Sequence, residues 1–274
     1  MIYKELPVKV NGSEEYAKLQ AYILDTPGSE CEMKIKKRPL VLICPGGGYH
    51  KLSYREGEPL AMYFLSRGYH ACVLRYSVSP ARFPTAVLEV GKALEMIVSR
   101  QEEWKIETEQ IFVHGASAGG HLAASYGIYW NQDFMPSKIK PAGIILSYPV
   151  ITADKMYGHQ DSFRNLLGDR YEICRETQSL ETQVTSTMPP TFIWHTAEDA
   201  TVPVENSLLL AMALRRVGVP MELHIFPKGV HGLSLANSLV EKEDGRCVQD
   251  ECKCWIDLAL TWMNGLTKKE NKNE

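Results

Sequence analysis

The sequence has no hydrophobic run approaching the roughly 20 apolar residues of a membrane-spanning helix. Its 274 residues include 30 Lys and Arg against 33 Asp and Glu, so the formal net charge is only −3. No excess of one sign therefore favours nucleic acid or an anionic membrane surface as a partner. The first ten residues contain Lys4, Glu5 and Lys9 and lack the apolar segment of a secretory signal, which predicts a cytoplasmic location.

The cysteine patterns of a disulfide framework or a zinc site are also missing. The seven cysteines are an odd number, and Cys247, Cys252 and Cys254 cluster with spacings of five and two and no nearby histidine. Cys44 and Cys72 lie in apolar runs and are expected to be small buried side chains. We therefore expect a reduced protein that needs no metal ion and no organic cofactor. The oligomeric state stays open, a homodimer included.

Segments typical of strands alternate along the chain with segments typical of helices. The predicted strands are 17–24, 40–44, 69–76, 111–113, 143–148, 191–194 and 222–226, and the predicted helices are 58–67, 84–98, 121–129, 204–217 and 252–263. This alternation is typical of an α/β fold, with a mostly parallel central sheet in a three-layer α/β/α sandwich. Residues 152–188 interrupt this alternation of strands and helices. We expect them to form a small helical lid inserted into a single domain spanning 1–274.

The most informative stretch is 113–120, which reads Val-His-Gly-Ala-Ser-Ala-Gly-Gly and places Ser117 in a G-x-S-x-G pattern. An apolar strand precedes it and a helix-compatible segment follows it. A sharp turn between them would lift the serine hydroxyl clear of the backbone and aim the amide of Ala118 at a developing oxyanion. The match by itself fits equally well a small-residue turn that only packs tightly.

Three further strand ends carry suitable chemistry, and function gathers at such ends in doubly wound sheets. Gly47 and Gly48 follow the strand at 40–44, and we expect their amides to complete an oxyanion hole. Asp199 follows the strand at 191–194, with Glu198 and Asp154 as competing acids.

The fourth strand end carries His231, which follows the strand at 222–226. Among the eight histidines it is singled out because it follows the last strand on a loop bounded by glycines. Ser117, Asp199 and His231 occur in the chain order of one class of serine hydrolase. The three residues therefore predict a nucleophile, an acid and a base in one catalytic triad.

The stretches Pro-Gly-Gly-Gly-Tyr at 45–49, Leu-Arg-Tyr-Ser at 74–77 and His-Gly-Ala-Ser-Ala-Gly-Gly-His-Leu-Ala at 114–123 resemble those of α/β-hydrolases. The similarity covers roughly residues 15–265 and is to the esterase/lipase group, which includes acetyl-xylan esterase-like and hormone-sensitive-lipase-like proteins. Pro45 stands where lipase-type relatives usually have histidine, so the chain is more similar to the carbohydrate-esterase-like branch.

This resemblance implies a serine esterase that hydrolyses short-chain esters, acetyl esters above all, of sugars or oligosaccharides. We expect Tyr49 and His50 to contact such a small-molecule or oligosaccharide substrate, and Tyr157 and His159 are further candidates for that pocket. An amide-directed hydrolase of the arylformamidase or peptidase kind would use the same triad. A non-catalytic binding protein on the hydrolase fold is the third reading.

Overall fold

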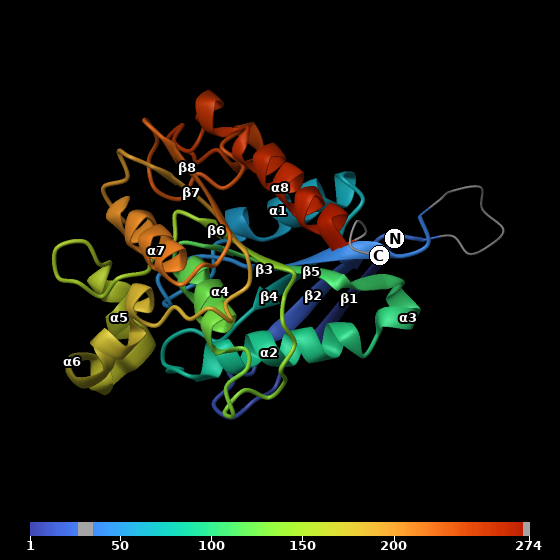
Figure 1. Ribbon diagram of the computed structural model, residues 1–274, viewed down its shortest axis with the longest axis horizontal. Helices are drawn as coiled ribbons and strands as arrows, with labels where there is room; N and C mark the ends of the chain where they lie inside the picture. The colour runs from blue at the N-terminus through green and yellow to red at the C-terminus, as the bar shows by residue number, and fades with distance from the viewer. Residues whose placement is uncertain (27–34, 271–274) are drawn as a thin grey trace.

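An eight-stranded sheet forms the centre of the molecule (Figure 1), in the order β1-β2-β4-β3-β5-β6-β7-β8. The structure is a computed structural model that describes residues 1–26 and 35–270. The strands are β1 (Ile2–Pro7), β2 (Lys18–Ile23), β3 (Arg38–Cys44), β4 (His70–Arg75), β5 (Ile106–Ala116), β6 (Gly143–Ser147), β7 (Thr191–Thr196) and β8 (Met221–Phe226). Strand β2 pairs antiparallel with β1 and β4, and all other pairs are parallel. The predicted mostly parallel sheet is confirmed.

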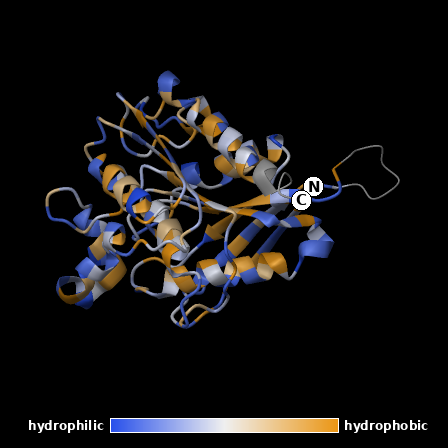
Figure 2. Cartoon of the chain, viewed as in Figure 1, coloured by the Kyte–Doolittle hydropathy of each residue, from blue (hydrophilic) through white to orange (hydrophobic). Residues whose placement is uncertain are grey.

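Helices cover both faces of this sheet and complete the predicted three layers. The main helices are α1 (Glu58–Ser66), α2 (Thr85–Val98), α4 (Ala118–Tyr129), α7 (Glu205–Arg216) and α8 (Trp255–Glu270). Side chains of β3 alternate between the faces: Leu40 and Leu42 belong to the core with α2, α4 and α7, whereas Val41 and Ile43 pack with α1 and α8. Strand β3 is accordingly apolar on both sides, and the central strands are largely coloured as hydrophobic (Figure 2). Among the described helices, none is long and apolar enough to cross a bilayer.

The structure adds to the predicted elements where the sequence pattern is weak. Strand β1 was not predicted, because it is an edge strand whose side chains are exposed or half-buried and show no apolar pattern. Strand β5 begins five residues before the predicted 111–113, at Ile106, and this first half is largely polar. Helix α4 begins at Ala118, directly after Ser117, rather than at His121.

Residues 152–188 form short helices, as predicted. They contain α5 (Gln160–Leu167), α6 (Tyr171–Cys174) and three 3₁₀ turns. The buried side chains of α5 are Phe163, Leu166 and Leu167, together with Ser162. The amide of Phe83 donates to the carbonyl of Leu166 over 2.8 Å. The insertion is thus packed on the body of the protein through one face of α5.

The cysteines described by the structure are free thiols. Cys44 and Cys72 are buried within β3 and β4, as predicted, and burial raises the pKa of both. Cys247 and Cys252 are buried and Cys254 is exposed. Within residues 1–26 and 35–270, no group of three or more His, Cys, Asp or Glu is placed to hold a metal ion.

The core face of α2 offers a test of this packing. Leu94 is fully buried in the core, whereas the adjacent Glu95 is exposed and forms a surface ion pair with Lys92. Leu94→Ala should lower the free energy of unfolding by about 2–5 kcal/mol, because it leaves a cavity in a packed core. Glu95→Ala should change it by less than about 0.5 kcal/mol. Urea unfolding of both variants checks this, and equal effects would contradict the assignment of this face to the core.

Candidate active site

Ser117 lies at a sharp turn between β5 and α4 and has a left-handed backbone, with φ 54° and ψ −121°. A non-glycine residue holds such a conformation only where its surroundings enforce it. Its carbonyl accepts the amides of Gly120, His121 and Val150 at 2.9–3.1 Å, and its own amide donates to Ser147 over 3.0 Å. Hydrogen bonds from α4 and from the neighbouring strand β6 therefore hold Ser117 at the tip of the turn.

The glycines of the G-x-S-x-G pattern are explained by close backbone contacts. A Cβ on Gly115 would lie 2.0 Å from the carbonyl oxygen of Gly119. A Cβ on Gly119 would lie 2.1 Å from the carbonyl oxygen of Cys44, at the end of β3. Neither position has room for a side chain, so the two glycines let α4 start immediately behind the serine.

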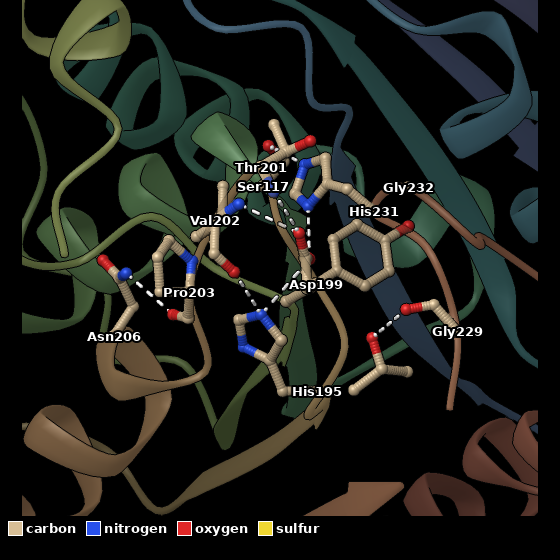
Figure 3. Close-up of polar contacts among 12 residues, drawn as sticks. Ser117, His195, Asp199, Thr201, Val202, Pro203, Asn206, Gly229, His231 and Gly232 are labelled. Carbon is tan, nitrogen blue, oxygen red and sulfur yellow. Dashed lines mark hydrogen bonds and ion pairs between the residues drawn. The ribbon is translucent and has the colours of Figure 1, made fainter. Parts of the chain in front are cut away.

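His231 joins Ser117 to Asp199 in a continuous chain of hydrogen bonds (Figure 3). Its Nε2 lies 2.8 Å from Ser117 Oγ, and its Nδ1 lies 2.6 Å from Asp199 Oδ2. Because an ionised carboxylate can only accept, Nδ1 carries the proton and Nε2 is free to accept the serine proton. The structure thus brings together the three residues that the sequence proposed as acid, base and nucleophile.

Asp199 is fully buried, and each of its oxygens is held by donors. Oδ1 accepts the amides of Thr201 and Val202, both at 2.9 Å, while Oδ2 lies 3.3 Å from His195 Nε2 besides its bond to His231. Burial alone would raise the pKa of Asp199, but the hydrogen bonds from His195, His231 and the backbone hold it well below its usual range. Asp199 is therefore ionised at neutral pH, with one carboxylate oxygen 2.6 Å from His231 Nδ1.

The two competing acids are placed elsewhere. Glu198 and Asp154 are exposed, and Asp154 Oδ1 accepts the amide of Met156 over 2.7 Å in its own loop. His195 is a supporting residue that the sequence reasoning did not identify. It is buried, its Nδ1 lies 2.8 Å from Ser207 Oγ, and its Nε2 donates to the Val202 carbonyl over 2.9 Å. Only its position four residues before Asp199 offered a hint.

The glycine loop after β3 faces the same cavity as the triad. Gly47 and Gly48 line this cavity together with Ser117 and His231, and their φ angles of 132° and 65° favour glycine. A Cβ on Gly47 would lie 2.1 Å from the Lys51 carbonyl oxygen. Ala118 is the first residue of α4, where the helix leaves backbone amides without an internal partner. The three amides proposed for an oxyanion hole are therefore on elements that border the nucleophile.

Of the two residues expected to contact substrate, only His50 lines the cavity. The Tyr49 side chain is 2% exposed and packs on Tyr76, and its hydroxyl hydrogen-bonds His121 Nδ1 over 3.0 Å. The expectation for Tyr49 is therefore corrected. Its backbone adopts a φ of 56°, and its ring lies in the core instead of lining the cavity.

Three other histidines are buried and structural. His114 contacts Ser147 Oγ at 2.9 Å and stacks on Trp255, and His121 bridges Tyr49 and the Gln178 carbonyl. Burial lowers the pKa of His114 to about 3 and the pKa of His121 to about 4. His70 resembles them, because burial lowers its pKa to about 4. These rings stay neutral at pH 7 and do not compete with His231.

The insertion contributes one wall of the site through α5. His159 and Ser162 lie over the Cα of Gly48, since a Cβ there would be 3.9 Å from His159 Cε1 and 3.8 Å from Ser162 Oγ. Asn165 Nδ2 donates to the Gly48 carbonyl over 2.9 Å. The spacing of three residues places all three on one side of the helix. The other candidate from this segment, Tyr157, is not among the residues that line the cavity.

The cavity has a volume of about 1010 Å³, at the upper end of the range of sites for small organic ligands. Its lining is rich in polar and charged side chains, among them His50, Lys51, His159, Asn165 and Lys242. Ser117 lines this cavity and is only 8% exposed. The cavity therefore has room for a ligand with a polar body beside the Ser117 hydroxyl.

Comparison with known proteins assigns the chain to a family. Residues 30–214 match the model of the BD-FAE family. The chain is 39% identical over 212 residues to endo-1,4-beta-xylanase B of Butyrivibrio fibrisolvens, covering 73% of this chain and 33% of that protein. It is 30% identical over 194 residues to an acetylxylan esterase of Xylanibacter ruminicola, covering 69% of this chain and 39% of that protein. The chain thus spans only about a third to two fifths of the length of these curated relatives.

A solved structure is similar over a much larger share. The acetyl ester-xyloside bifunctional hydrolase from Caldicellulosiruptor lactoaceticus superposes with a TM-score of 0.78 at 36% identity, covering 92% of this chain and 88% of that chain. Together with the observed sheet, this likeness confirms the expected α/β-hydrolase fold.

The assignment of the acid can be tested on the reactivity of the serine. Asp199→Asn should slow the labelling of Ser117 by a fluorophosphonate on the order of 10⁴-fold, because His231 loses the partner that sets its tautomer and balances its charge. Glu198→Gln removes the neighbouring exposed acid and should leave the rate unchanged. Rapid labelling of the Asp199 variant, or loss of labelling in the Glu198 variant, would show that the acid is misassigned.

Proposed function

We propose that this chain, which belongs to the BD-FAE family, is a serine carboxylesterase that removes short acyl groups, acetyl above all, from sugars or oligosaccharides. The observation that carries the proposal is the unbroken path from Asp199 through His231 to Ser117, with contacts of 2.6 and 2.8 Å. This geometry is what a serine needs in order to become a nucleophile, because its hydroxyl is unreactive without an adjacent base.

In the first half-reaction Ser117 Oγ attacks the ester carbonyl carbon while its proton passes to His231 Nε2. The carbonyl oxygen becomes an oxyanion, which the amides of Gly47, Gly48 and Ala118 would stabilise by hydrogen bonds. The bond to the alcohol oxygen then breaks, and His231 returns its proton to that oxygen. An acyl-serine and a free alcohol result.

In the second half-reaction water attacks the acyl-serine carbonyl, and His231 takes the proton of the water. The bond to Ser117 Oγ breaks, and the proton returns to the serine. Asp199 stabilises the imidazolium in both halves while remaining ionised, as its lowered pKa requires. The sum is hydrolysis of one ester to one alcohol and one carboxylic acid.

The choice of a sugar ester rests on the site and on the relatives. The cavity is lined by polar side chains such as His50, Ser53 and Asn165, which suit an alcohol bearing several hydroxyl groups. Relatives at 30–36% identity are named an acetylxylan esterase and an acetyl ester-xyloside bifunctional hydrolase. An acetyl group is small enough to sit against the buried serine, with the sugar in the wider cavity.

The test is hydrolysis of p-nitrophenyl acetate and of acetylated xylo-oligosaccharides. Ser117→Ala should lower kcat on the order of 10⁶-fold without changing thermal unfolding, because the nucleophile alone is lost. Ser99→Ala removes an exposed hydroxyl outside the cavity and should stay active.

The same panel should include an N-formyl arylamine and an aminoacyl amide. Ester turnover that survives Ser117→Ala would overturn the proposed mechanism. A wild-type enzyme that prefers either amide would replace the esterase by the amide-directed alternative. Absence of any turnover and of fluorophosphonate labelling would favour the non-catalytic reading.

A further inference from the structure

One buried acid beside the triad has no part in the proposed mechanism. Glu56 ends a 3₁₀ turn, Tyr54–Glu56, between the glycine loop and α1, and its side chain is buried, with the residue 3% exposed. Its Oε2 accepts the amide of Gly46 over 3.0 Å, and its Oε1 lies 2.8 Å from the hydroxyl of Tyr148. Both carboxylate oxygens thus have partners, and the partners come from opposite sides of the nucleophile.

Both of these hydrogen bonds are donated to the carboxylate of Glu56. The Gly46 amide can only donate. The Tyr148 hydroxyl accepts the amide of Ser234 over 2.8 Å and donates its own proton to Glu56 Oε1. Burial, and next the negative charge of Glu56, raises the pKa of Tyr148 well above its usual value, which keeps this proton in place. Hydrogen bonds to a charged acceptor are the stronger kind.

The first end of this link lies at the proposed oxyanion hole. A Cβ on Gly46 would be 2.7 Å from Glu56 Oε2 and 2.9 Å from Ser117 Cβ, so carboxylate, loop and nucleophile are in direct contact around this residue. Gly46 immediately precedes Gly47, whose amide is proposed to bind the oxyanion. A shift of the Gly46 backbone would therefore move the donor away from the reacting oxygen.

The second end lies at the base. The ring of Tyr148 packs edge-on against the imidazole of His231, with centroids 5.1 Å apart and planes at 71°. Its hydroxyl holds the backbone of Ser234, three residues after His231. The neighbouring Arg55 fixes the same loop through the carbonyls of Gly232 and Val240, at 3.0 and 3.1 Å. Residues 55 and 56 therefore contact both the loop that carries His231 and the glycine loop at Gly46.

We propose that Glu56 is a positioning residue for ester hydrolysis, which couples the glycine loop at Gly46 to His231 through Tyr148. One carboxylate sets the distance between the oxyanion donors and the base. Both must act on the same carbonyl group, and misplacement by about 1 Å can cost on the order of a hundredfold in rate. This inference rests on the proposed esterase function and concerns how the oxyanion donors and His231 are held at the right distance from each other.

The test compares Glu56→Gln with Glu58→Gln, both assayed on p-nitrophenyl acetate. Glutamine at 56 keeps the size of the side chain but has only one acceptor, so one of the two donors loses its partner. We expect kcat per labelled active site to fall about tenfold to a hundredfold, with KM changed less than about threefold. Glu58 is exposed at the start of α1, and its variant should match the wild type.

Two further measurements separate positioning from a general loss of stability. A boronic acid that mimics the tetrahedral intermediate should bind Glu56→Gln more weakly by the same factor as kcat/KM falls. Tyr148→Phe keeps the ring against His231 and removes the hydroxyl, so it should lower kcat similarly. The kcat of the double variant should be no more than about threefold below that of the less active single variant, because the two residues act through one contact.

An unchanged kcat in folded Glu56→Gln would overturn the inference, as would losses that multiply in the double variant. If Glu56→Gln does not fold, Tyr148→Phe decides: reduced kcat with a weaker boronate complex supports the coupling, and wild-type values refute it. In each of these outcomes wild-type ester turnover still depends on Ser117. Failure of the esterase proposal is distinct, since the wild-type protein itself would then be inactive on esters.

Discussion

The left-handed backbone at Ser117 is the constraint on which the site depends. It ends β5 and starts α4 within one residue, which lifts the hydroxyl out of the sheet. Hydrogen bonds to α4, to Val150 and to Ser147 offset the strain of this conformation. The tight turn also brings α4 against the end of β3, where only glycine fits at position 119. This close approach places the glycine loop that follows β3 next to Ser117.

The parallel sheet then gathers the remaining groups at the same edge. Asp199 follows β7 and His231 follows β8, and these strands lie on the other side of β5 from β3. The acid is buried and ionised because two backbone amides and His195 assist His231 in holding it. In the proposed mechanism, a buried negative charge with fixed donors would balance the imidazolium of His231 without having to reorganise when it forms.

The glycine loop is held at two points, and different parts of the chain supply them. Glu56 holds Gly46 from the side of the histidine loop, and Asn165 holds the carbonyl of Gly48 from the inserted helix α5. Backbone donors stabilise a transition state well only when their surroundings keep them in place. The insertion at 152–188 thus has a role in the architecture of the site, as part of its wall.

Much of this protein is determined locally by its sequence. The parallel sheet follows from the alternation of apolar segments, and Ser117, Asp199 and His231 each follow a strand in an order that permits one triad. The roles of Tyr49, His195 and Glu56 were decided only by tertiary structure. Tyr49 follows the glycines directly, yet its ring turns into the core, and Glu56 meets a hydroxyl 92 residues away. Periodicity and spacing report on neighbours along the chain, whereas the direction of a side chain and the partner of a buried charge depend on which distant segments the fold brings together.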